Sequence, residues 1–443
     1  MSASPGQPEL EALIDSALQE ARRIGASAAD AAVSVDSGLS VTVRLGEVET
    51  LEYHRDRGLG ITVYLGQRKG SATTSDLSAA AVSETVAKAV SIARYAAEDA
   101  YAGLPDPELL AMDYPDLDLY HPWALEADEA IELARASESA ALSYDQRITN
   151  SEGASIGTHS GVKVYGNTLG FIGGYPSTYY SLSCVVVGNQ DEQMERDYWY
   201  TASRYREGLE DAASVGRTAA ERTVRRLGAT RLATTRAPVL FVPELARGLI
   251  GHFLGAIRGS SQYRKSSFLL DSAGTQVFPS FIELDERPHV PRALGSAPFD
   301  AEGCRTHDRA VVHNGVVDGY ILNTYAARKL GLKSTGNAGG VHNLLLAPGP
   351  DDFDALMRRM GRGLVVTELM GQGVNGVTGD YSRGAAGFWV ENGAIVRPVN
   401  EITIAGNLKD MLRRIVAVGA DVDRRGSLQT GSILVEEMTI AGE

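Results

Sequence analysis

A glutamate and a histidine stand eight positions apart in the segment FVPELARGLIGHFLGAIRG, residues 241–259. The segment predicts an amphipathic helix, and zinc peptidases carry their metal ligands on such a helix. A site of that kind needs two histidines at i and i+4 and a glutamate beside the first, because this spacing places both rings on one face. Here Glu244 follows Pro243, and His252 has a glycine four positions before it and an alanine four positions after it.

The apolar residues of the same segment favour a different interpretation. They recur at helical spacing and would form one stripe, made of Leu245, Leu249, Phe253 and Ala256. Such a stripe is typical of a helix that packs on a core. We therefore favour a core-facing helix with one histidine whose polar atoms are satisfied within the protein. A metal site that combines Glu244 or His252 with ligands from elsewhere in the chain stays open as the alternative.

His342 lies in a second suggestive segment, TGNAGGVHN, residues 335–343. The glycines of this segment would let the backbone approach a ligand closely. His342 is therefore a candidate for substrate binding. A tight turn in which this histidine bonds to the backbone is the alternative that we favour.

The segment TGDYSRGAAGFWVENG, residues 378–393, combines charged, aromatic and glycine residues. Arg383 is suited to hold a peptide carboxylate through two hydrogen bonds, and Trp389 is suited to pack on an apolar side chain. Asp380 and Tyr381 complete this candidate substrate-binding set. An internal Asp380–Arg383 pair in a tight loop explains the same residues equally well.

The composition limits the classes of protein to consider. The chain has 443 residues, enough for two domains, and its net charge of -14 argues against a surface that binds nucleic acid. Two cysteines do not suffice for a disulfide framework or a four-thiolate zinc site. The N-terminus lacks the basic and apolar regions of a signal peptide, and no apolar run is long enough to span a membrane. We therefore expect a cytoplasmic protein.

Hydrophobic periodicity predicts the elements of the first half of the chain. Alternating apolar residues predict strands before and after the turns at Gly46 and Gly66, and again between about residues 147 and 200. A 3.6-residue period predicts helices at residues 8–24, 77–99, 127–142 and 210–227. The order helix, strands, helix thus occurs twice, which suggests an internal pseudo-repeat.

The predicted domain boundary lies within residues 227–238, after which strands dominate. Helices interrupt these strands at residues 244–258 and 406–416. Because the strands come in runs, we predict an α+β fold. The domains expected are an N-terminal α+β domain at residues 1–230 and a C-terminal, strand-rich domain at residues 236–443.

Five segments carry a resemblance to a known family: YRKSSFLLD (263–271), SAPFDAEGCRTHDR (296–309), ARKLGLKSTGNAGGVHN (327–343), GLVVTELMGQGVNGVTGDYSRGAAGFWVENG (363–393) and EITIAGNLKDML (401–412). Through them the chain resembles the TldD/PmbA family over essentially its whole length. These proteins are described as cytoplasmic metallopeptidases and as modulators of DNA gyrase, linked to peptide-antibiotic maturation and antitoxin degradation. The resemblance implies a TldD–TldE heterodimer that cleaves unfolded peptides in an internal chamber.

The resemblance also implies where zinc would and would not be held. In the TldD-type subunit an H-E-x-x-x-H helix and a late cysteine bind the metal. Aligned on this chain, Pro243 stands at the first histidine, Glu244 at the glutamate, Gly248 at the second histidine and Thr430 where the late cysteine is expected. These positions imply a vacated zinc site, a place on the PmbA/TldE side of the family, and no metal or cofactor in this chain itself.

Three functions are consistent with these residues. The favoured one is a supporting subunit that holds peptide substrate and pairs with a TldD-type zinc subunit, or with a second copy of itself, and does not contact nucleic acid or membrane directly. The second is an autonomous metallopeptidase whose unconventional site uses His252, His342 or Glu244. The third is a regulatory protein that acts on DNA gyrase or a toxin system without proteolysis.

Overall fold

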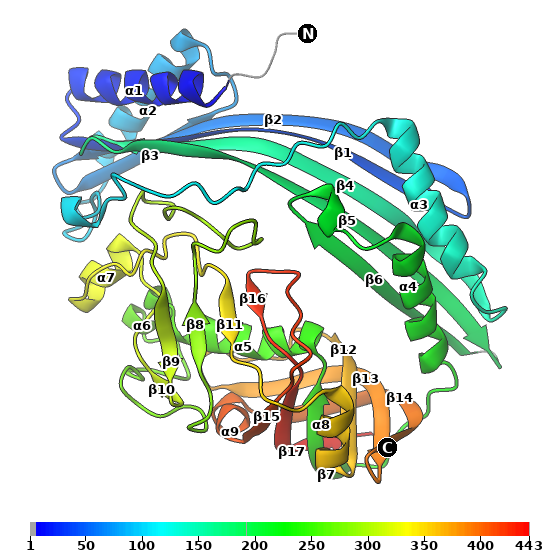
Figure 1. Ribbon diagram of the computed structural model, residues 1–443. Coiled ribbons are helices and arrows are strands. Elements are labelled where there is room, and N and C mark those ends of the chain that lie inside the picture. The colour runs from blue at the N-terminus through cyan, green and yellow to red at the C-terminus, as the bar shows by residue number, and fades with distance from the viewer. Residues whose placement is uncertain (1–5, 192, 443) are drawn as a thin grey trace.

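Three β-sheets and the helices that cover them make up the computed structural model, which describes residues 6–191 and 193–442. Strands and helices occur in separate runs, which confirms the predicted α+β class. The strands up to Ser203 form one long sheet that arches over the rest of the molecule (Figure 1). The strands from Thr235 onward form two smaller sheets beneath it.

The first sheet has six antiparallel strands in the order β3-β2-β1-β4-β5-β6. Helices α1 and α2 bracket β1–β3 along the chain, and α3 and α4 bracket β4–β6, so the predicted helix–strands–helix order does occur twice. The bounds are α1 Gln7–Arg23, β1 Ala28–Arg44, β2 Glu47–Leu65, β3 Arg68–Thr74, α2 Ala79–Tyr95, α3 Ala127–Leu142, β4 Ile148–Asn167, β5 Ile172–Gln190, β6 Gln193–Ser203 and α4 Ala212–Arg226.

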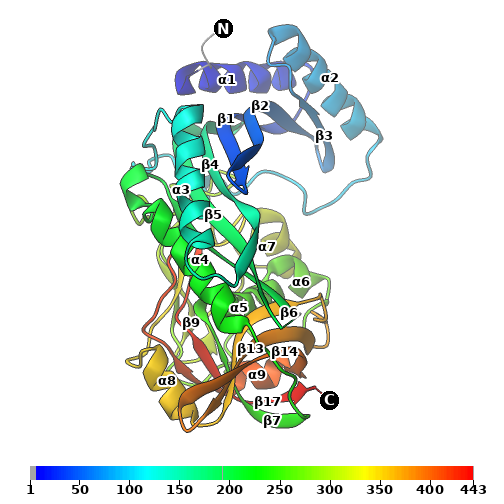
Figure 2. The ribbon, with the colours of Figure 1, turned by 90° about the vertical axis from the view of Figure 1, so that its right-hand side faces the viewer.

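The side-chain alternation along β1 explains why the helices cover only one face of this sheet. Val33 packs in the core formed with α1 and α2, and Val41 packs in the core formed with α3 and α4. Figure 2 shows α3 and α4 lying against each other on that face. Because successive side chains of a strand point to opposite faces, even-numbered residues such as Ala32 and Ser34 face the second half of the chain.

The second half of the chain builds a six-stranded sheet, β14-β13-β12-β7-β17-β15, and a five-stranded sheet, β10-β9-β8-β11-β16. Helix α5 contributes Leu249 and Phe253 to a core that includes Val239 of the first of these sheets and Leu284 of the second. The bounds are β7 Thr235–Phe241, α5 Pro243–Ile257, α6 Gly259–Tyr263, β8 Leu284–Glu286, β9 Arg309–His313, β10 Val316–Val317, α7 Thr324–Leu330, β11 Leu344–Leu346, α8 Phe353–Met360, β12 Gly363–Met370, β13 Asp380–Glu391, β14 Ala394–Asn407, α9 Leu408–Arg413, β15 Ile415–Val418, β16 Leu428–Gln429 and β17 Ile433–Ala441.

One expectation for the second half is wrong, and one of the two alternatives left open there is excluded. The sequence predicted two helices, but the described residues also form α6, α7 and α8, which are five to eight residues long. Helices this short show too few turns for a periodic pattern; side-chain caps at Asn323 and Asp352 stabilise two of them instead. Residues 380–391 form strand β13 rather than the tight loop that was considered.

No helix within the described residues is long and apolar enough to cross a membrane.

Candidate functional site

Helix α5 begins at Pro243, whose ring suits the first helical turn. Leu249 and Phe253 are buried, which confirms the predicted core-facing stripe. Gly248 lies outside this apolar stripe and is exposed to solvent, and a Cβ added there would meet no atom within 4 Å. At the two positions aligned with zinc-binding histidines, α5 therefore carries a proline and an exposed glycine, neither of which has a side-chain ligand atom.

Glu244, between these two positions, lies against two guanidinium groups. Its Oε1 atom is 3.1 Å from Nη1 of Arg222 and 3.6 Å from Nη2 of Arg425. Arg222 comes from α4 and also donates from Nε to Asp197 on β6 at 3.3 Å. The Glu244 carboxylate, only 12% exposed, is thus ion-paired to one arginine from each half of the chain.

Asp423 holds the second of these arginines in place. It accepts a hydrogen bond from Nε of Arg425 at 2.9 Å and lies 3.6 Å from Nη2 of Arg247. Burial raises the pKa of Asp423, but the Arg425 hydrogen bonds and the Arg247 charge outweigh burial and bring this pKa below its usual value. The backbone N–H of Asp423 donates to the carbonyl oxygen of Thr430 at 3.1 Å. Thr430, where the late cysteine is expected, is therefore linked to Glu244 through Asp423 and Arg425.

Arg226 extends this group of charges across the two halves of the chain. Its side chain is 8% exposed and contacts the carboxylates of Glu195 at 3.1 Å, Asp197 at 3.5 Å and Glu368 on β12. We call the whole set the arginine network: Arg222, Arg226, Arg247 and Arg425 with Glu195, Asp197, Glu244, Glu368 and Asp423.

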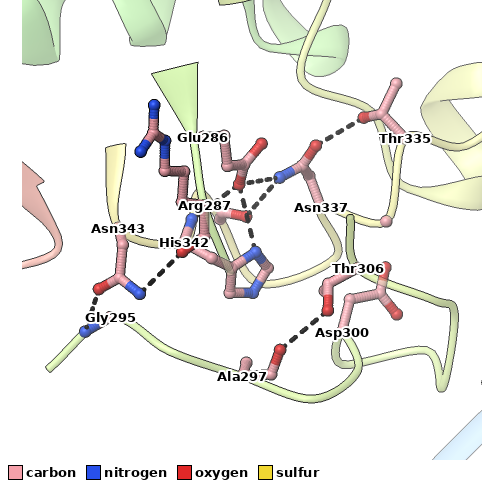
Figure 3. Close-up of polar contacts among 12 residues, drawn as sticks. Glu286, Arg287, Gly295, Ala297, Asp300, Thr306, Thr335, Asn337, His342 and Asn343 are labelled. Carbon is pink, nitrogen blue, oxygen red and sulfur yellow. Dashed lines mark hydrogen bonds and ion pairs between the residues drawn. The ribbon is translucent and has the colours of Figure 1, made fainter. Parts of the chain in front are cut away.

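A second buried polar group surrounds Glu286, the last residue of β8 (Figure 3). Its Oε2 atom accepts from Nε of Arg309 at 2.9 Å, and its Oε1 atom accepts from Nδ2 of Asn337 at 2.7 Å and from the backbone N–H of His342 at 2.7 Å. Burial raises the pKa of Glu286, but the bonds to His342 and the charge of Arg309 outweigh burial and leave this pKa below its usual value. We call these four residues the Glu286 cluster.

The His342 ring is oriented by the same carboxylate. Its Nδ1 atom lies 3.2 Å from Oε1 of Glu286. Because an ionised carboxylate only accepts hydrogen bonds, Nδ1 is the donor in this contact, and the ring tautomer that carries its one proton on Nδ1 has Nε2 as an acceptor. His342 lines a cavity of about 540 Å³ between the uncovered face of the first sheet and loops of the second half. The favoured expectation was a tight turn in which His342 bonds to the backbone, but both the ring and the backbone N–H of His342 bond to the side-chain carboxylate of Glu286.

Asp300, Glu302 and Cys304 form the one group of potential metal ligands found among the described residues, with ligand atoms within 4.8 Å of one another. Their hydrogen bonds fit a structural role. The Asp300 carboxylate already accepts three backbone N–H groups at 2.9 Å, and Glu302 accepts the N–H of Thr324. Burial, together with the Asp300 charge, raises the pKa of the Cys304 thiol, which disfavours the thiolate that a metal would need.

Profiles of one family match most of the chain. They are described as PmbA/TldA metallopeptidase domain 1, central domain and C-terminal domain, and they match residues 29–93, 120–227 and 234–442 respectively. The chain belongs to the PmbA/TldD metallopeptidase family.

Individual relatives of the PmbA/TldD family agree with this assignment. The chain is 54% identical over 415 residues to Metalloprotease PmbA of Escherichia coli O157:H7, which covers 94% of this chain and 92% of the relative. It is 51% identical to a Metalloprotease PmbA homolog of Haemophilus influenzae, over 98% and 97% of the two chains.

Solved structures share the PmbA/TldD fold over nearly the full chain. A Bacteroides thetaiotaomicron protein described as a modulator of DNA gyrase superposes with a TM-score of 0.93 at 30% identity, covering 98% of this chain and 99% of that one. TldE of Thermococcus kodakarensis superposes with a TM-score of 0.86 over 97% and 100% of the chains. At 20% identity, this second likeness concerns the fold alone.

Four of the five candidate substrate residues of this PmbA/TldD chain lie on β13, and two of these four are buried. Tyr381 and Trp389 are buried at 3% and 4% exposure in the core. Asp380 bonds to Thr378 and Asn407, and Arg383 donates to a backbone carbonyl, so the considered Asp380–Arg383 pair is not formed. The fifth candidate, His342, belongs to the separate Glu286 cluster.

His252 also lacks a ligand-like environment. Its ring lies edge-on to the Tyr381 ring with centroids 6.0 Å apart. Burial and the nearby charge of Arg383 lower the pKa of His252. This arrangement agrees with the favoured interpretation of a histidine packed within the protein.

The sequence did not reveal Glu286, Arg222 or Arg425 as site residues. Glu286 and Arg309 lie 23 positions apart, and Arg222 and Glu244 lie 22 positions apart in different elements. No spacing rule joins such pairs. A pairing signal was available only for Asp423 and Arg425, which stand two positions apart in DVDRRG.

Proposed function

We propose that this chain is the PmbA/TldE-type subunit of a two-subunit metallopeptidase, in which a TldD-type partner supplies the zinc. One observation carries the proposal. Glu244, at the position of the glutamate that would activate a metal-bound water, is ion-paired to Arg222 and Arg425. Both arginines contact the same carboxylate oxygen, Oε1, so this oxygen is engaged in ion pairs and the two positive charges beside it disfavour a metal dication.

The neighbouring residues support this assignment. A catalytic zinc site uses three protein ligands and keeps one position for water. Around Glu244 the aligned positions hold Pro243, Gly248 and Thr430, and the Thr430 hydroxyl donates to a backbone carbonyl at 2.9 Å. A dication placed here would also meet the positive charges of the two arginines that already neutralise Glu244.

The substrate class we propose is unfolded or small peptides, including precursors of peptide antibiotics and antitoxins, in the cytoplasm. The first sheet supports this class, since one of its faces carries no helix and looks onto the second half of the chain. The long strand β2 is exposed at residues 47–57, beyond the reach of its partner β3. Exposed strand edges bind extended peptides through backbone hydrogen bonds.

The test combines metal analysis with peptide cleavage. Zinc content would be measured by mass spectrometry, and cleavage of an unstructured peptide would be followed, for this chain alone and for the chain purified with a TldD-type partner. We expect zinc and chelator-sensitive cleavage only in the complex. Stoichiometric zinc and cleavage in the lone chain would contradict the proposal and favour an autonomous metallopeptidase.

A further inference from the structure

The cavity beside His342 lies where the first sheet meets the second half of the chain, and we call it the interdomain cavity. Its volume is about 540 Å³. On the sheet side, Gly58, Ser34, Lys163 and Tyr175 are register partners across β2, β1, β4 and β5, so their side-chain positions share one face. All four line the cavity. No acidic partner of Lys163 is found among the described residues, so its ammonium group is free to meet a ligand.

The opposite wall of the interdomain cavity is a glycine loop with free backbone donors. Gly339 and Gly340 have φ values of +98° and +131°, a conformation that residues with a side chain rarely adopt. The N–H of Gly340 donates to the carbonyl of Asn337. Within the described part of the chain, the N–H groups of Gly339 and Val341 find no acceptor, although both residues line the cavity.

This loop is held rigidly by buried side chains. Asn337 donates to Glu286 and to the carbonyl of Gly340 at 3.0 Å, and the N–H of Ala338 donates to Asp300. Free N–H groups on a fixed, glycine-rich loop form an anion-binding concavity. His342 follows directly and presents the Nε2 acceptor described above.

We propose that the interdomain cavity binds the C-terminal residue of a peptide. The ammonium group of Lys163 and the N–H groups of Gly339 and Val341 receive the carboxylate, and Nε2 of His342 accepts the N–H of the last peptide bond. Apolar and aromatic groups, among them Phe299 and Tyr165, line the rest of the cavity and pack on the terminal side chain. The proposal rests on the proposed function, since it assumes that the chain handles peptides.

Asp300 also lines the cavity, and a second carboxylate there would repel the ligand if it were free. It is not free, because its oxygens accept the N–H groups of Glu302, Cys304 and Ala338. These three donors offset the Asp300 charge at short range, which leaves Lys163 as the ionic group that a ligand can contact directly.

The test compares two fluorescent, unstructured peptides that differ only in a C-terminal carboxylate or carboxamide. Their binding to the full chain would be measured by fluorescence anisotropy. We expect the acid to bind about tenfold more tightly than the amide, as a charge-assisted hydrogen bond would give. Lys163→Met should remove this preference, and Lys163→Arg should retain much of it. Lys88→Met, which changes the same charge on helix α2 on the helix-covered face, is the control that should change nothing.

A small carboxylate could use the same donors, so an N-acetylated amino acid would be added as competitor. If it displaces the peptide only at much higher concentration, a peptide terminus is the ligand. Competition at equal concentration would support a carboxylate-binding site but show that its ligand is a small acid and not a peptide terminus. Equal affinity for acid and amide, no effect of Lys163→Met, or no binding of either peptide would overturn the proposal. None of these results depends on zinc, so a failure here is distinct from a failure of the proposed function.

Discussion

The arginine network and the Glu286 cluster both hold carboxylates against arginine side chains, but they differ in whether a neighbouring polar group remains available to a ligand. In the arginine network four guanidinium groups face five carboxylates, and Oε1 of Glu244 contacts two of the arginines. In the Glu286 cluster both carboxylate oxygens accept hydrogen bonds, and one of these oxygens also orients the imidazole of His342, a residue that lines a cavity. The ion pairs of Glu244 thus have no further partner to orient, whereas the ion-paired Glu286 also orients the side chain of His342, which can contact a ligand.

The two regions use their buried charges for different purposes: one joins the two halves of the chain, and the other positions a loop and a histidine ring. The arginine network joins residues 195–226 to residues 244–247, 368 and 423–425, so it fixes the two halves of the chain relative to each other. The Glu286 cluster lies wholly within the second half and fixes one loop and one ring. We therefore expect substitutions in the first region to affect stability and substitutions around the second to affect stability and ligand binding together.

Arg226→Met should give the largest effect. It removes the guanidinium group that contacts Glu195, Asp197 and Glu368 and leaves these acids facing one another, which costs about 3–5 kcal/mol of unfolding free energy. Urea unfolding followed by circular dichroism would measure it. The control is Arg225→Met on the neighbouring, exposed position, where we expect less than about 1 kcal/mol. Equal effects of the two substitutions would mean that the network is not what joins the halves.

Glu286→Gln should destabilise the chain by about 2–3 kcal/mol at neutral pH, because it leaves the buried Arg309 without a charged partner. The pKa of Glu286 is lowered in the folded state, so its charge contributes stability above the usual pKa of 4.5. That contribution is lost as the pH falls through the lowered value. The difference between wild type and variant in urea unfolding should therefore shrink below about pH 4.5, while a constant difference would argue against the ion pair as its cause.

Asp30 on β1 sharpens the comparison, because it is a half-buried carboxylate that has no arginine partner among the described residues. Burial raises its pKa to about 7. The folded state then holds a proton that the unfolded state releases, so stability is greatest below the unfolded value of 3.8 and falls as the pH rises toward 7. Asp30→Asn should be nearly neutral at pH 4.5 and stabilising by about 2 kcal/mol at pH 8. Urea unfolding at both pH values tests this, and a variant that is less stable at pH 8 would contradict it.

The sequence predicted the helix–strands–helix repeat and α5 because both depend on local periodicity. Val33 and Val41 stand an even number of residues apart on β1, and Leu249 and Phe253 stand one helical turn apart on α5. The candidate substrate set on β13 was a composition argument, and it was uninformative because Trp389 and Tyr381 serve the core. The Glu286 cluster could not be predicted, since Glu286, Arg309 and His342 come from three segments that only the folded sheet brings together.

Glu244→Gln should give the smallest effect and tests the comparison at its central residue. In this variant Arg222 retains its ion pair with Asp197, and Arg425 retains its ion pair with Asp423. We therefore expect the free energy of unfolding to fall by less than about 1 kcal/mol. Peptide cleavage by the complex with a TldD-type partner should stay within a few-fold of wild type. A general base contributes about a hundredfold or more to rate, so a loss of that size would show that Glu244 acts in catalysis despite its arginine partners. In that case the ion pairs around Glu244 would have to break during turnover. Glu244 and His342 would then both be groups that act on a ligand, and the difference between the two regions would disappear.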